Sequence, residues 1–198
     1  MNIMKPFVLG FYGESDSGKT TLIVDILSRL KKEGCNVASV KISDKKISID
    51  SEGKDTWKHA SAGSNLVVFS TDCETDFLLK QKMGGTEIVD SINRFKRYDI
   101  IIIEGVNDES IPKIRIGKIK ERKNTVITYN GDFEKLIEYI KKEINRRNEM
   151  EKISIKVNGK EILLTEFPTD IIKNAIVGML KSLKGIEKIE DVEIRFKL

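Results

Sequence analysis

The chain has 198 residues, a length that suits one domain with a buried core, or one domain with a small appendage. Its net charge of +4, from 35 basic against 31 acidic residues, is too mild to indicate a nucleic-acid partner. Two separated cysteines and one histidine argue against a zinc site, and the longest apolar run, Ile100–Ile103, is far too short to cross a membrane.

The first 150 residues alternate strand-like and helix-like segments. The apolar run Phe7–Tyr12 predicts a buried strand that leads straight into a glycine-rich turn. Thr21–Gly34 then predicts a helix whose apolar face carries Leu22, Ile23, Ile26, Leu27 and Leu30. Asn36–Ile42 predicts the next strand, so the chain begins with a strand, a turn, a helix and a strand.

The same alternation continues as far as residue 147. Further strands are predicted at Asn65–Ser70, Asp76–Gln81, Asp99–Glu104, Lys113–Ile116 and Thr125–Tyr129. Helices are predicted at Lys54–Ala62, Thr86–Phe95 and Asp132–Arg147. Strands that alternate with helices indicate an α/β fold with a mostly parallel sheet covered by helices on both faces.

The organisation changes after residue 148. Asn158-Gly159 between two alternating segments predicts a tight hairpin, Thr169–Gly185 predicts an amphipathic helix, and Asp191–Leu198 predicts a last strand. Residues 151–198 are therefore expected to form a small ββαβ appendage. The appendage shows no catalytic constellation, so we interpret it as a docking or dimerisation module.

The cysteine usage also predicts where the protein works. Few cysteines and no signal peptide suit a reducing compartment, so we expect a cytoplasmic protein with no nucleic-acid or membrane partner.

The glycine-rich turn fits the phosphate-binding pattern G-x-x-x-x-G-K-[ST], with Gly13, Gly18, Lys19 and Thr20 at the constrained positions. Backbone N–H groups of such a loop and of the helix that follows direct positive dipoles at phosphate. Lys19 adds a full charge at the terminal phosphates, which makes it a catalytic candidate, and the Thr20 hydroxyl is placed for Mg²⁺. The residues predicted to bind the nucleotide here are Gly13, Glu14, Ser15, Asp16, Ser17, Gly18, Lys19, Thr20 and Thr21. The loop predicts a P-loop NTPase.

Glu104 is the second candidate for catalysis and metal binding. It ends the apolar strand Asp99–Glu104, and Gly105 after it lets the backbone turn sharply. In this architecture such an acid coordinates Mg²⁺ through water or orients an attacking water. The alternative is a strand-end glutamate that faces solvent.

Asp50 and Gly53 match D-x-x-G, the pattern with which switch GTPases sense a terminal phosphate, and both are predicted to contact the nucleotide. The pattern is short and weak by itself. Lys54 stands where a glutamine would orient water, so we expect slow hydrolysis. His59 is better explained as a surface or packing residue than as a metal ligand.

Three segments, "GESDSGKTTL", "DSEGKDTWKHASAGSN" and "DIIIIEGVNDESIPKI", together resemble the molybdopterin-guanine dinucleotide biosynthesis protein B family over about residues 6 to 145. The resemblance implies a P-loop domain over residues 1–148 that binds GTP and Mg²⁺, forms homodimers and hydrolyses GTP very slowly. It also implies assistance to the guanylyltransferase that joins GMP to molybdopterin, with that enzyme and molybdopterin as partners.

The chain departs from the family in two places. The family commonly carries histidines just after its second strand, where this chain reads "KISDKKISID". Asp44 in that segment is a further candidate for the Mg²⁺ site. Residues 151–198 lie outside the minimal family core, so the resemblance assigns them no role.

The sequence leaves other functions open. The N-K-x-D motif that reads guanine is missing, and Thr128–Asp132, which follows a late strand, is the segment predicted to stand near the base. Without the resemblance, ATP would be as good a ligand. An ATP-dependent ligase or small-molecule kinase of the dethiobiotin-synthetase type shares the loop and the acid–glycine pair. A nickel-insertion GTPase would usually carry histidine-rich or cysteine-bearing segments, which this chain lacks.

Overall fold

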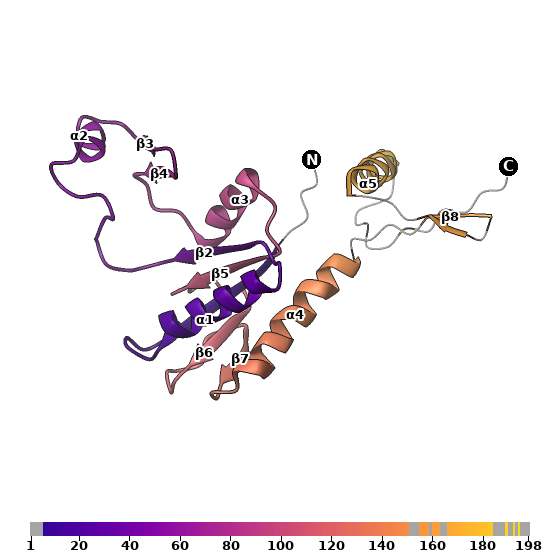
Figure 1. Ribbon diagram of the computed structural model, residues 1–198, viewed down its shortest axis with the longest axis horizontal. Helices are drawn as coiled ribbons and strands as arrows, with labels where there is room; N and C mark the ends of the chain where they lie inside the picture. The colour runs from indigo at the N-terminus through magenta and orange to yellow at the C-terminus, as the bar shows by residue number, and fades with distance from the viewer. Residues whose placement is uncertain are drawn as a thin grey trace.

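The computed structural model describes residues 6–150, 155–158, 160–162, 166–183, 189, 192 and 194 (Figure 1). Its centre is a five-stranded sheet in the order β2-β5-β1-β6-β7, and every neighbouring pair is parallel. The strands are β1 (Phe7–Gly13), β2 (Val37–Lys41), β5 (Ile100–Glu104), β6 (Lys113–Ile116) and β7 (Thr125–Tyr129). The predicted α/β fold with a mostly parallel sheet is confirmed.

Helices cover both faces of this sheet (Figure 1). On one face, α1 (Lys19–Lys32) and α4 (Phe133–Met150) pack against Phe7, Leu9 and Phe11 of β1. On the other face, α3 (Gly85–Phe95) packs against the opposite side of β5.

The four isoleucines of β5, Ile100–Ile103, explain why this strand lies inside the sheet. All four are fully buried, and they alternate between the α1–α4 core and the α3 core. Burying an isoleucine side chain contributes roughly 1.5–3 kcal/mol, so a strand that is apolar on both faces is favoured only where both faces are covered.

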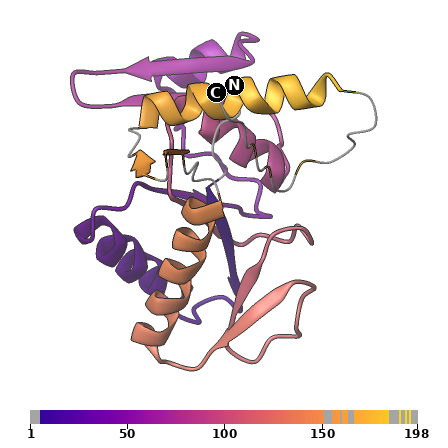
Figure 2. The same ribbon diagram turned by 90° about the vertical axis from the view of Figure 1, so that its right-hand side faces the viewer.

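The segment between β2 and α3 adds no strand to the five-stranded sheet, although Phe77 in this segment packs against Phe95 of α3. It holds α2 (Asp55–Ser61) and an antiparallel hairpin of β3 (Leu66–Ser70) and β4 (Thr75–Leu79), which project away from the main sheet (Figures 1 and 2). The strands were predicted, but their separation from the sheet was not. A short turn suffices to pair two antiparallel strands, whereas a parallel neighbour needs a longer crossover.

The C-terminal region contains β8 (Ile155–Val157), which pairs antiparallel with β9 (Lys160–Ile162), and α5 (Glu166–Lys181). This order agrees with the predicted hairpin and helix. The predicted last strand, Asp191–Leu198, lies outside the described residues except at positions 192 and 194. Among the helices described, none is long and apolar enough to cross a membrane.

Candidate nucleotide-binding site

The phosphate loop, Gly13–Thr20, joins the end of β1 to the start of α1. A Cβ at Gly13 would lie 2.5 Å from the Ile116 carbonyl oxygen, so β1 and β6 approach too closely there for any other residue. Gly18 precedes α1 in the left-handed conformation, with φ of 79°, and no side chain caps the helix. The first N–H groups of α1 are therefore left for an anion.

The Lys19 side chain folds back over the phosphate loop. Its ammonium donates hydrogen bonds to the Glu14 carbonyl oxygen and, over 3.3 Å, to Ser17 Oγ. An ammonium has three donors, and these contacts hold it beside the N–H groups of the loop. The loop thus concentrates one full positive charge and several backbone dipoles at one point, as phosphate binding requires.

Glu104 lies next to this loop at the end of β5, between β1 and β2. The Thr20 hydroxyl donates to Glu104 Oε1 over 3.0 Å, and the Lys41 ammonium lies 3.4 Å from the same oxygen. The Glu104 side chain is only 13% exposed, which contradicts the solvent-facing alternative. Gly105 follows with φ of 83°, where a Cβ would collide with the Ile42 carbonyl oxygen.

Lys41 is the site residue that sequence reasoning missed. It is the last residue of β2, and the sheet register places it directly beside Glu104. Nothing in the local sequence indicates this contact, because it depends on β2 being the neighbour of β5.

Thr20 and Glu104 have the chemistry that Mg²⁺ needs. Magnesium takes oxygen ligands and is usually held by one or two side chains together with phosphate oxygens and water. The described residues contain no group of three or more histidine, cysteine, aspartate or glutamate side chains that could hold a metal by themselves. The phosphates of a bound nucleotide and water would therefore supply the remaining ligands.

The D-x-x-G pattern lies in the projecting segment, where Asp50 has partners of its own. Its carboxylate accepts a hydrogen bond from Thr56 Oγ1 over 2.8 Å and pairs with Lys80 at 3.3 Å, and its side chain is 4% exposed. The Thr56 hydrogen bond and the Lys80 charge hold the pKa of Asp50 below its ordinary value. These contacts tie the start of α2 to the end of β4.

The other two candidates from this region are Gly53 and Asp44. Gly53 adopts a φ of 85° in the turn before α2, and Asp44 is exposed in the segment after β2. Within the described residues, no hydrogen bond or ion pair joins Asp44 or Asp50 to the phosphate loop. Their contact with a nucleotide or with Mg²⁺ stays a prediction.

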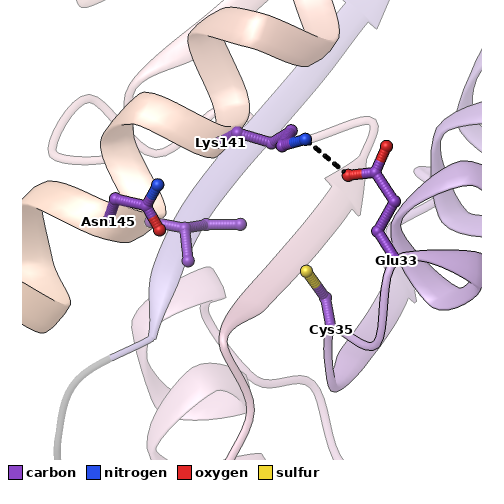
Figure 3. Close-up of a pocket in the computed structure, with 5 residues that line it drawn as sticks. Glu33, Cys35, Lys141 and Asn145 are labelled. Atoms are coloured by element: carbon purple, nitrogen blue, oxygen red, sulfur yellow. Dashed lines mark ion pairs between the residues drawn. The ribbon is translucent and has the colours of Figure 1, made fainter.

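A cavity of about 300 Å³ lies at the other end of α1 from the phosphate loop, lined by Glu33, Cys35, Lys141, Ile144 and Asn145 (Figure 3). Lys141 pairs with Glu33 at 2.8 Å across it. Burial raises the pKa of the Cys35 thiol, so its reactive thiolate is disfavoured. The cavity therefore offers no activated thiol.

Residues 8–142, more than half of the chain, match the family described as molybdopterin guanine dinucleotide synthesis protein B. The chain belongs to this family. The matched region starts within β1 and ends within α4, so it includes the phosphate loop and Glu104. The family resemblance that was inferred from the sequence is confirmed.

Curated relatives and a solved structure agree with this membership. The chain is 26% identical over 229 aligned positions to a putative molybdopterin-guanine dinucleotide biosynthesis adapter protein of Methanocaldococcus jannaschii, covering 94% of this chain and 96% of the relative. It is 33% identical over 109 positions to the molybdopterin-guanine dinucleotide biosynthesis adapter protein of Haemophilus influenzae, covering 54% of this chain and 61% of the relative. The crystal structure of Bacillus subtilis MobB shares the fold, with a TM-score of 0.57 at 20% identity, covering 68% of this chain and 96% of that chain.

Proposed function

We propose that this protein holds GTP with Mg²⁺ in the phosphate loop and presents it to a guanylyltransferase. Membership of the family makes the protein an adapter in molybdopterin-guanine dinucleotide biosynthesis and a nucleotide-binding P-loop protein. The observation that supports the Mg²⁺ site is the hydrogen bond between Thr20 and Glu104, because it brings a hydroxyl and a carboxylate together at the opening of α1.

Each residue of the site has a separate task in this proposal. Backbone N–H groups from Gly13 to Thr21 bind the phosphates, and Lys19 neutralises the terminal ones. Thr20 and Glu104 orient Mg²⁺ and its waters. Asp50 and Gly53 would respond to the terminal phosphate, and Asp44 would approach the metal from the segment after β2.

Hydrolysis of GTP by the protein alone is expected to be slow. Lys54 follows Gly53, so no glutamine is available there to position an attacking water. The chemistry of nucleotide transfer then falls to the guanylyltransferase, which joins GMP to molybdopterin. We propose the cytoplasm as the site of this step, where GTP is available.

We also propose that the protein works as a homodimer. One face of the β3–β4 hairpin carries the cross-strand pairs Leu66–Leu79 and Val68–Phe77, and all four side chains are exposed. Such an apolar face gains stability when a second copy covers it. Val68→Glu should give monomers by light scattering, whereas Val126→Glu, at an exposed position of β7, should leave the dimer intact. A monomeric parent protein would contradict the proposal.

The role of the C-terminal region is a separate proposal. We propose that residues 151–198 form a small domain of their own, which docks on the partner enzyme. The family match ends at residue 142, before this region begins. Removal of residues 151–198 should weaken binding to the guanylyltransferase while affinity for GTP is unchanged. Loss of both would place these residues in the nucleotide-binding domain.

The decisive experiment for function is a guanylylation assay with the purified transferase, molybdopterin carrying its metal, and limiting Mg²⁺–GTP. The protein should raise the yield of the guanine dinucleotide, and Lys19→Ala should abolish the increase. Turnover of GTP by the protein alone should stay well below the roughly 1–100 s⁻¹ of a kinase. Fast turnover with a small carboxylate or alcohol and no partner would instead favour the ligase or kinase alternative.

A further inference from the structure

A second group of polar residues lies at the same edge of the sheet as the phosphate loop, and the proposed Mg²⁺–GTP site does not use it. These residues, Asn130, Gly131 and Asp132, connect the end of β7 to the start of α4. Because ligands of parallel α/β sheets bind at the carboxyl ends of the strands, this connection is placed for contact with the same ligand.

The order of the strands gives the direction in which a bound nucleotide extends. In the proposed site, Glu104 and Thr20 would hold the metal, and hence the terminal phosphates, on the β5 side of β1. The other side of β1 is occupied by β6 and then β7. A ribose and base that extend away from the metal would then lie over the ends of β6 and β7.

The sheet register places the ends of β1, β6 and β7 at one level. Gly13 of β1 pairs with Ile116 of β6, and Ile116 pairs with Tyr129 of β7. The next residues of the three strands thus leave the sheet in one row. Two strand spacings, about 10 Å, separate β1 from β7, so a ribose that leaves the phosphate loop brings its base to the Asn130–Asp132 connection.

We propose that Asp132 and Asn130 recognise guanine, an inference that rests on the proposed nucleotide site. Asp132 Oδ1 accepts a hydrogen bond from the Lys135 amide over 3.1 Å, and no hydrogen bond within the described residues occupies its Oδ2. Asn130 Oδ1 accepts from the Asp132 amide over 3.2 Å, which leaves its two amide N–H donors to face a ligand.

These two side chains match guanine and not adenine. A carboxylate accepts the N1–H and the exocyclic amino protons of guanine, while the Asn130 amide donates to O6, where adenine carries an amino donor instead. Adenine presents a lone pair at N1, which the Asp132 carboxylate repels. The pair therefore supplies the discrimination that the missing N-K-x-D motif provides elsewhere.

The contact with Lys135 also allows a purely structural role for Asp132, since such a hydrogen bond caps a helix. Asp132→Asn separates the two roles. Asparagine caps helices about as well as aspartate, so α4 should stay stable. Its amide, however, donates where the carboxylate accepted, which suits the C2 carbonyl of xanthine better than the amino group of guanine.

The test is calorimetric titration of parent protein and Asp132→Asn with Mg²⁺-bound GTP, ATP and xanthosine triphosphate. The parent should prefer GTP. The affinity of the variant for GTP should fall roughly tenfold, and its affinity for xanthosine triphosphate should rise. Its melting temperature should be unchanged. Asp90→Asn, which removes an exposed carboxylate from α3, should change neither preference. If Asp132→Asn melts early, Asn130→Ala keeps the cap and should lower the GTP-to-ATP ratio about threefold.

The outcomes distinguish this inference from the site on which it rests. A protein that binds GTP through Lys19 but shows the same base preference in Asp132→Asn and Asn130→Ala would overturn the guanine reading alone. Equal affinity of the parent for GTP and ATP would do the same. Failure of the parent to bind any triphosphate would overturn the proposed nucleotide site as well.

Discussion

Thr20 and Glu104 meet at the carboxyl edge of the sheet, where the hydroxyl donates to the carboxylate over 3.0 Å although 84 positions separate the two residues in the chain. The contact exists because β5 is inserted between β1 and β2, which brings the end of an apolar strand beside the first turn of α1. A hydroxyl and a carboxylate held in this way are suited to orient Mg²⁺ on a bound triphosphate.

Glu104→Gln should weaken the dependence of nucleotide binding on Mg²⁺. The amide oxygen can still accept the hydrogen bond from Thr20, but the negative charge that attracts the cation is lost. We expect the Mg²⁺ concentration for half-maximal GTP binding to rise about tenfold, equivalent to about 1.4 kcal/mol, while GTP binding measured in EDTA is unchanged. Glu109→Gln is the control, because it removes a surface carboxylate that pairs with Lys123. Identical Mg²⁺ titrations of variant and parent would remove Glu104 from the metal site.

Lys41→Met should have the opposite effect and raise the apparent affinity for Mg²⁺. The Lys41 ammonium and the metal would compete for Glu104 Oε1, from which Lys41 lies 3.4 Å away. The Lys41 side chain is 66% exposed, so solvent screens this ion pair and the gain in apparent Mg²⁺ affinity should be about two- to threefold. Lys45→Met, at an exposed position after β2, should leave the titration unchanged. Weaker Mg²⁺ binding in Lys41→Met would show that Lys41 supports the bound complex.

Asp50→Asn should destabilise the protein in a manner that depends on pH. The Thr56 hydrogen bond and the Lys80 charge lower the folded-state pKa of Asp50 below its ordinary value of 3.8. The ionised group therefore contributes stability above pH 3.8, and this contribution is lost as the pH falls through the lower folded-state pKa. Melting temperatures of variant and parent should differ at pH 7 and converge below pH 3.8. Asp76→Asn, at an exposed position of β4, should show little difference at either pH.

A difference in melting temperature between Asp50→Asn and the parent that stays the same from pH 7 to below pH 3.8 would mean that the substitution acts through packing and not through charge. A loss of GTP affinity in Asp50→Asn would instead support the predicted role of Asp50 at the nucleotide.

The local features of the site were predictable from the sequence. The phosphate loop between β1 and α1 follows from spacing alone, because glycine at positions 13 and 18 and the apolar period of α1 act over a few residues. Glu104 was predicted to lie near Mg²⁺ because it ends an apolar strand. The structure places it beside Thr20, and its role at the metal stays a prediction.

The remaining features depend on contacts between distant segments. Lys41 joins the site only because β2 is the sheet neighbour of β5, an order that no local pattern reveals. Asp50 matched a phosphate-sensing pattern, yet its ion pair is with Lys80, 30 residues further along the chain. The separate β3–β4 hairpin was missed for the same reason, since strand propensity does not say which strand is the partner.

The most direct test of the central claim is a calorimetric titration of Mg²⁺–GTP into the parent protein, Lys19→Ala and Lys31→Ala. Lys31 lies on the last turn of α1, so its loss changes the net charge equally but leaves the phosphate loop intact. We expect the parent and Lys31→Ala to bind one GTP per chain with the same affinity. Lys19→Ala should bind at least about tenfold more weakly, a loss on the order of 1.4 kcal/mol, because the loop loses its only full positive charge. Equal GTP affinity in all three proteins would contradict the account.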